Sequence, residues 1–264
     1  MKRLMRSIYT AADTQLGVGR IGLMAFMALL ACVAGPVPAA TAPSPYPSMA
    51  PIDQYLSSSQ EAEIALARTA APKSVSDDAT VMTLTKDGFE TAVKGSNGFV
   101  CFVGRSWAQD FDAPEFWNPH IRTAQCWNSA AVSSYFPEYL KRTQWVMAGV
   151  SKDEMLARTK AAWASHEFSL PTQTSMVYMM SKDQYIVDPV PGPGGESHWY
   201  PHIMFFVPSD EEGKWGENHR GSPIFSTTSD VDPVTTCFIV VAMWSDGTLY
   251  PYPKPGQANA HHHH

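Results

Sequence analysis

The sequence predicts an α+β fold, with one domain built around an antiparallel sheet. Three observations support it: short strand-like runs separated by Asx-Gly pairs in the first half, two capped helices in the middle, and strand-like runs again in the second half. Helices and strands that are segregated along a chain favour an antiparallel sheet over a parallel one.

The first element that we expect is a helix from Glu61 to Ala70. The tetrapeptide Ser58–Glu61 is a capping-box pattern, in which the two side chains satisfy backbone N–H groups at the start of a helix. Strong helix formers follow until Pro72, which cannot continue a helix.

Three strand-like runs come next: Val81–Thr85, Phe89–Val93 and Phe99–Val103. The pairs Asp87-Gly88 and Asn97-Gly98 separate them, and such pairs favour the tight turns of hairpins. The sequence therefore predicts a three-stranded antiparallel meander here.

The middle of the chain predicts a long ordered loop followed by two helices. Residues 105–128 are rich in aromatic side chains but have neither the helix nor the strand period. A helix is expected from Pro137 to Ala148, because proline is tolerated in a first turn. A second capping box, Ser151–Glu154, opens a helix that ends near Ser165.

Three or four further strands complete the predicted sheet. The runs are Ser175–Met180, a shorter one at Tyr185–Val187, His202–Val207 and Thr236–Trp244, with a long polar loop at 208–234. This element order is distantly similar to that of PAS-like and profilin-like sheets, a similarity that implies no function.

The start of the chain predicts export to the periplasm or the cell exterior. Residues 1–40 combine a basic segment, the short apolar run Ile21–Val33 and small residues at their end, which is typical of a secretory signal peptide. We expect a flexible Pro/Ser-rich leader at 41–50, the domain at 51–255, and a tail at 256–264 whose four histidines are typical of a purification tag. Lipoprotein anchoring through Cys32 is a minor alternative.

Composition excludes some partners. The formal net charge is −6 and basic clusters are lacking, which argues against nucleic acid. The apolar run near the start is too short for a membrane span. No oligomeric state is indicated. After signal removal Cys101, Cys126 and Cys237 remain, and we expect Cys101 to pair with Cys237 because both lie in strand-like runs.

Five segments resemble a family of uncharacterised exported bacterial proteins. They are Met49–Tyr55, Asn97–Val100, Pro114–Pro119, His198–Met204 and Trp244–Thr248, and the likeness covers most of the mature chain. The resemblance implies no activity. That family often has a third histidine where this chain has Tyr200, and the difference weakens a tri-histidine metal site.

The strongest candidate site is the run that contains Glu196, His198, Tyr200 and His202. In an extended strand these side chains share one face, about 6.6 Å apart in succession, so the two histidines need a bend to share a ligand. Imidazole and carboxylate groups suit zinc, copper or iron. A divalent transition metal, a metal-free acid/base or ligand site, and a structural hydrogen-bond network all remain open.

These residues lead to two functional hypotheses. The first is a metal-dependent hydrolase, favoured over an oxidoreductase, with Glu196 or Tyr200 as the acid/base group. His120 or His219, from the two long loops, would be an additional ligand. The second is a non-catalytic module that binds a small molecule or carbohydrate between sheet and helices. A third metal-capable side chain beside His198 and His202 would favour the enzyme.

Overall fold

The computed structural model describes residues 44–186 and 199–251, and it is an α+β single domain, as the sequence predicts. The described strands form one sheet in the order β2-β1-β3-β4-β5-β6-β8-β7. Their bounds are β1 Thr80–Thr85, β2 Gly88–Val93, β3 Val100–Gly104, β4 Thr123–Trp127, β5 Ser175–Met179, β6 His202–Pro208, β7 Ile224–Thr228 and β8 Val234–Val240. With this eight-stranded arrangement, the similarity to PAS-like or profilin-like sheets remains a prediction.

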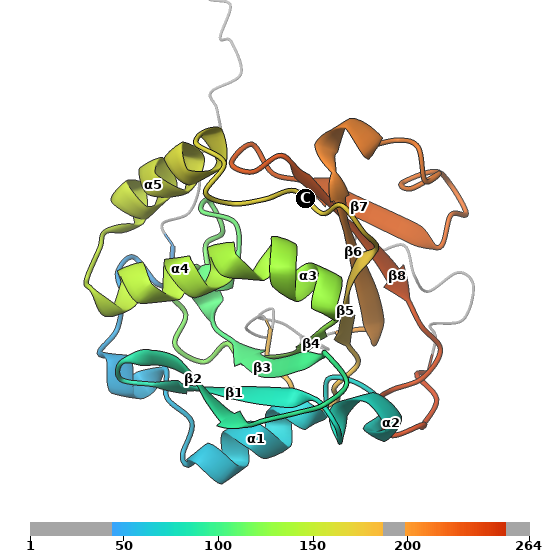
Figure 1. The fold of residues 1–264 in the computed structure, drawn as a ribbon, viewed down its shortest axis with the longest axis horizontal. Coiled ribbons are helices and arrows are strands. Elements are labelled where there is room, and N and C mark those ends of the chain that lie inside the picture. The colour runs from blue at the N-terminus through green and yellow to red at the C-terminus, as the bar shows by residue number, and fades with distance from the viewer. Residues whose placement is uncertain (1–43, 187–198, 252–264) are drawn as a thin grey trace, which may run out of the picture. The chain divides into compact units, whose positions relative to one another are not determined.

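The helices cover both faces of the sheet (Figure 1). They are α1 Gln60–Arg68, α2 Lys73–Ser76, α3 Ser129–Ser134, α4 Phe136–Met147 and α5 Lys152–Ala164. In Figure 1 the sheet curves around α3 and α4, while α1 and α2 lie against its opposite face. This curvature places α4 opposite strands from both halves of the chain.

Each face of the sheet has its own core, because side chains alternate along a strand. On β3, Phe102 points into the aromatic core beneath α4, which includes Trp127 and Phe136. Cys101 and Val103 on the same strand join the smaller core beneath α1. The side chains beneath α4 are therefore large and aromatic, and those beneath α1 are small.

The predicted helices are confirmed with small changes in their bounds. Helix α1 begins one residue earlier than expected, and Ser59 caps it by accepting a hydrogen bond from the backbone N–H of Ala62. Ser151 caps α5 in the same way through Glu154. These ends were predictable because the capping signal is local in sequence.

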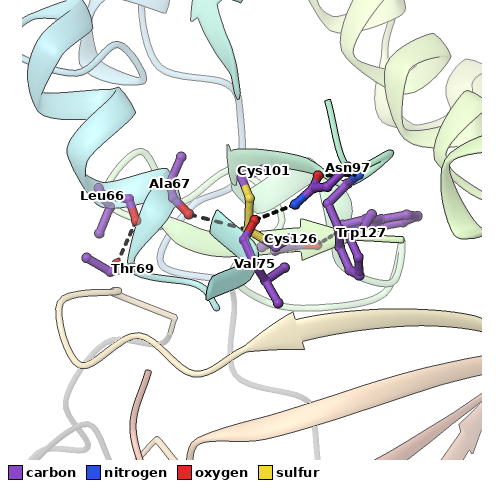
Figure 2. Close-up of a disulfide and its surroundings, with 10 residues drawn as sticks. Leu66, Ala67, Thr69, Val75, Asn97, Cys101, Cys126 and Trp127 are labelled. Carbon is purple, nitrogen blue, oxygen red and sulfur yellow. Dashed lines mark hydrogen bonds between the residues drawn. A yellow bond between two sulfur atoms is a disulfide. The ribbon is translucent and has the colours of Figure 1, made fainter. Parts of the chain in front are cut away.

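The predicted three-stranded meander is wrong. Strands β1 and β2 form the expected antiparallel hairpin at Asp87-Gly88, but β3 pairs with β1 and runs parallel to it. The chain crosses the start of β1 instead of forming a hairpin at Asn97-Gly98, and Asn97 donates its side-chain N–H to the carbonyl of Val75 (Figure 2). A Cβ on Gly95 would lie 2.2 Å from the Ala79 backbone, so the crossing requires glycine.

Two of the long loops contain strands that the sequence did not indicate. Strand β4 lies within residues 105–128 and is buried at every position, so it lacks the alternation of a half-exposed strand. Strand β7 lies within residues 208–234 at one edge of the sheet. Of the expected strand at Tyr185–Val187, the described residues show a bridge between Tyr185 and Arg122, and Val187 lies outside them.

The disulfide joins Cys101 to Cys126, so the expected pairing of Cys101 with Cys237 is wrong (Figure 2). The two bonded cysteines face each other on the adjacent strands β3 and β4. Cys237 is a buried free thiol on β8, which is separated from β3 by three strands. The pairing was missed because β4 was not recognised as a strand.

The ends of the chain lie mostly outside the described residues. The expected signal peptide, Cys32 and the histidine tract fall there and remain predictions. Residues 44–50, which the sequence assigned to a flexible leader, contact the aromatic core through Tyr46 and Met49. Within the described ranges, no helix is both long enough and apolar enough to cross a membrane.

Candidate functional site

A cavity of about 370 Å³ lies between the sheet and α4. The sheet contributes Gln125 and Trp127 from β4, Met204 and Phe206 from β6, Thr227 from β7, and Thr236 and Phe238 from β8. Helix α4 and the residue before it contribute Tyr135, Glu138, Tyr139 and Arg142, and the loop after the short 3₁₀ helix Ser106–Ala108 contributes Gln109 and Asp110. The side chains from β4 and β6 are buried and those from β8 are half-buried, whereas Asp110 and Thr227 at the rim are exposed.

Strand alternation brings the sheet residues to this face. Phe206 and Thr236 are directly opposed in the ladder between β6 and β8, and so are Met204 and Phe238. Thr227 pairs with Thr236 on the other side of β8. Because paired residues point to the same face, these side chains form a continuous surface across three strands, which ends at Thr227 on the rim.

Gln125 is held in a fixed orientation on β4. Its amide oxygen accepts a hydrogen bond from Trp127 Nε1 at 2.8 Å, and its Nε2 donates to Thr123 Oγ1 at 2.9 Å. A Cβ on the neighbouring Gly104 would lie 2.7 Å from Gln125 Nε2, so this arrangement depends on glycine at that position.

Glu138 and Arg142 are the charged groups on the helix side of the cavity, and both are buried, with 2 % and 6 % of their surfaces exposed. They lie one turn apart on α4, with Arg142 Nη1 3.4 Å from Glu138 Oε1. Glu138 Oε2 accepts a hydrogen bond from Trp163 Nε1 on α5 at 2.7 Å. Arg142 Nε has no hydrogen-bond partner in the described structure.

Asp232, between β7 and β8, adds a second buried carboxylate. It accepts a hydrogen bond from the Tyr135 hydroxyl at 2.8 Å, which fixes the phenol against the cavity wall. Loss of hydration raises the pKa of Asp232, and the charge of Asp110 raises it further, while the hydrogen bond from Tyr135 opposes this. Burial also raises the pKa of Tyr135 well above its usual value.

The electrostatics of this cluster change the protonation of Glu138. Burial, together with repulsion from Asp232, raises its pKa to about 7, although Arg142 and the hydrogen bond from Trp163 favour the charged form. Asp110 at the rim also has a raised pKa, through loss of hydration and then through repulsion from Asp112. A carboxyl group that titrates near neutral pH inside a cavity is common at functional sites.

His202, the centre of the site predicted from sequence, lies on the same strand face as Met204 and Phe206, next to the cavity floor. Only 4 % of it is exposed, so it is more deeply buried than expected. Its Nδ1 lies 2.9 Å from the carbonyl of Tyr200, which can only accept, so Nδ1 carries the proton. Nε2 has no hydrogen-bond partner in the described structure, and burial lowers the pKa of the ring to about 4.

The other predicted site residues have separate surroundings. Tyr200 packs its ring edge against Tyr250 at 5.4 Å, and the exposed His120 packs against Tyr185 at 6.4 Å. His219 is also exposed, in the segment where Asn218 pairs with the backbone of Ser226 on the edge strand β7. Glu196 and His198 lie outside the described residues.

No metal centre is formed by the part of the chain that the structure describes. Within residues 44–186 and 199–251, no three His, Cys, Asp or Glu side chains are grouped so that they could hold a metal ion. The expected zinc, copper or iron ion therefore remains a prediction, and it depends on Glu196 and His198.

Comparisons with known proteins give no further guidance. No protein-family model matches the chain, and neither curated proteins nor solved structures yield a match. The residues of the cavity and His202 are therefore the features from which a function can be inferred.

The cavity cluster was missed in the sequence analysis, although one signal for it is present. Phe136, Tyr139 and Val146 mark the buried side of α4, and Glu138 and Arg142 lie beside them at a spacing of four residues. An acid and a base at that spacing are usually an exposed pair. Only the tertiary structure, with α5 and the loop at Gln109 packed over them, shows that both are buried.

Proposed function

We propose that this protein is an exported, non-catalytic binding module that holds a small polar molecule in the cavity between the sheet and α4. The observation that carries this proposal is a concave site with aromatic walls and a few convergent polar groups, which is the usual form of a small-molecule site. Gln125 and Tyr135 are held in place by their own hydrogen bonds. Such preorganisation reduces the entropic cost of binding.

Export is supported by two independent features. The first 40 residues have the pattern of a signal peptide. The chain also contains the buried disulfide between Cys101 and Cys126, and structural disulfides persist mainly in oxidising compartments.

The binding proposal can be tested by measuring thermal stability against a panel of sugars, amino acids and amines. Thr227 is exposed at the rim of the cavity, so Thr227→Trp should obstruct its mouth. We expect at least one compound to raise the Tm of the wild type but not that of Thr227→Trp. Thr91→Trp, on the distant edge strand β2, is the control and should retain the response. A ligand that stabilises all three proteins equally would contradict a site in this cavity.

A metal-dependent hydrolase remains a second hypothesis, and one observation favours it. His202 presents an unprotonated, buried Nε2 without a partner among the described residues, which is the form of imidazole that binds metals. The additional ligands would be His198 and a carboxylate such as Glu196. The test is elemental analysis of the protein without its terminal histidine tract, for the wild type and for His202→Ala. Equal metal content in both proteins would exclude His202 as a ligand.

A further inference from the structure

The cavity has more acidic than basic side chains around it. Glu138 and Asp110 line it, and Asp232 stands directly behind Tyr135. Arg142 is the only cationic side chain among the described residues that line it. One guanidinium therefore faces three carboxyl groups.

Arg142 already forms a hydrogen bond and an ion pair within the protein. Its Nη2 donates to the carbonyl of Gln109 at 2.6 Å, and its Nη1 lies 3.4 Å from Glu138. The guanidinium also lies over the ring of Phe111, 4.2 Å from its centroid. Its single charge is thus divided among Glu138, Asp110 and Asp232: it lowers the pKa of each carboxyl group, but burial and mutual repulsion keep all three raised.

The cavity walls are aromatic on the side of the sheet and of Tyr135. The ring of Phe206 lies 5.0 Å from Trp127 and 4.6 Å from Tyr135, measured between centroids. The faces of aromatic rings carry partial negative charge and attract cations, most strongly when the cation is poorly hydrated. These walls therefore add to the attraction that the carboxyl groups exert.

We propose that the ligand of this cavity is an organic ammonium ion, held between the aromatic rings of Trp127, Tyr135 and Phe206 and the carboxyl groups around Glu138. This inference rests on the proposed binding function. The alkyl groups of such an ion contact the rings, while its charge compensates the acidic groups. A hydroxyl or ether oxygen on the same ligand would supply the acceptor that Arg142 Nε lacks in the described structure.

The experiment compares three probes of one shape by isothermal titration calorimetry. Choline carries the positive charge, dimethylbutanol replaces the charged nitrogen with carbon, and dimethylbutanoate is the anionic counterpart. We expect choline to bind about tenfold or more tightly than the alcohol, which is the range of a partly desolvated cation–π interaction. Choline binding that is absent, or no tighter than that of either other probe, would overturn the inference. Binding of the alcohol or the anion would still leave the binding module standing.

Matched variants show which acidic side chains contribute to choline binding. Glu138→Gln keeps the shape of the side chain and an oxygen that accepts from Trp163, but it removes the charge. We expect it to weaken choline binding about tenfold and to leave the alcohol unchanged. Glu154→Gln, on the exposed side of α5, is the control and should bind choline like the wild type.

Asp110→Asn, at the exposed rim, also tests whether an acidic group contributes to choline binding, without changing a buried group. If neither Glu138→Gln nor Asp110→Asn alters choline binding, the acidic groups do not select the ligand and the proposal is wrong.

Discussion

Arg105 and Glu63 form an ion pair that is completely enclosed by the protein. Arg105 Nη2 lies 2.9 Å from Glu63 Oε2, and the two side chains are 0 % and 2 % exposed. The remaining polar atoms are also satisfied, since Glu63 accepts from the backbone N–H of Leu84 and Arg105 Nε donates to the carbonyl of Tyr55. The pair joins α1 to the residue that follows β3, and its hydrogen bonds reach β1 at Leu84 and the N-terminal segment at Tyr55.

Breaking this pair should destabilise the fold strongly. Arg105→Met leaves the Glu63 carboxylate buried without its cation, and we expect a loss of about 3–5 kcal/mol in the free energy of unfolding. Urea denaturation measures it. The control is Lys73→Met, which removes an exposed pair with Asp77 and should cost less than about 1 kcal/mol. Equal effects of the two substitutions would show that the buried pair contributes nothing beyond a surface pair.

The sequence predicted those parts of the fold that depend on neighbouring residues. The caps at Ser59 and Ser151 and the hairpin at Gly88 use signals that lie within a few positions of each other. The crossing at Gly95 could not be found in this way, because it depends on contact with Ala79 in a segment sixteen residues earlier. An Asn-Gly pair favours a turn locally, but the pairing partner of the next strand is decided by the tertiary structure.

The candidate site was predictable only in part. His202 was recognised because a titratable residue at the start of an apolar strand is unusual, but the structure buries it more deeply than expected. Glu138 and Arg142 were not recognised, since an acid and a base four residues apart are common on exposed helices. Their burial results from Trp163 and Gln109, which lie far away in the sequence.

The disulfide should be identifiable and important for stability. Non-reducing peptide mapping should recover a peptide that links Cys101 to Cys126 and should find Cys237 as a free thiol. The bond closes a loop with a sequence separation of 25, for which the chain-entropy estimate is about 3.5 kcal/mol. Changing both bonded cysteines to serine should therefore lower stability far more than Cys237→Ala. A recovered peptide that links Cys101 to Cys237 would contradict the structure.

Glu138 should make stability fall as the pH rises. Its pKa is about 7 in the folded protein, against 4.5 for an unburied glutamate, so the folded state binds more protons between these values. Stability is therefore fully present below pH 4.5 and is lost as the pH rises through 7. Relative to the wild type, Glu138→Gln should become more stable between pH 5 and pH 8, by up to about 3 kcal/mol.

Urea denaturation at several pH values checks this prediction, with Glu154→Gln as the control. Glu154 lies on the exposed side of α5, paired with Arg158, so its substitution should shift stability by a small amount at every pH. If Glu138→Gln also differs from the wild type by a constant amount across this range, Glu138 is not titrating near neutral pH.

His202 should have the opposite effect on stability from Glu138, because it makes stability fall as the pH is lowered. Burial lowers its pKa to about 4 from 6.5, so the unfolded chain binds more protons in this interval. The stability contributed by the neutral ring is fully present above pH 6.5 and is lost as the pH falls through 4. His202→Phe keeps an aromatic ring beside Trp199 and Phe238 but cannot be protonated, so its stability should fall less steeply between pH 6.5 and 4.

His219→Phe is the matched control, since His219 is exposed and its loss should leave the steep acid dependence of the wild type intact. Parallel pH profiles for the wild type and His202→Phe would mean that burial does not lower the pKa of this ring.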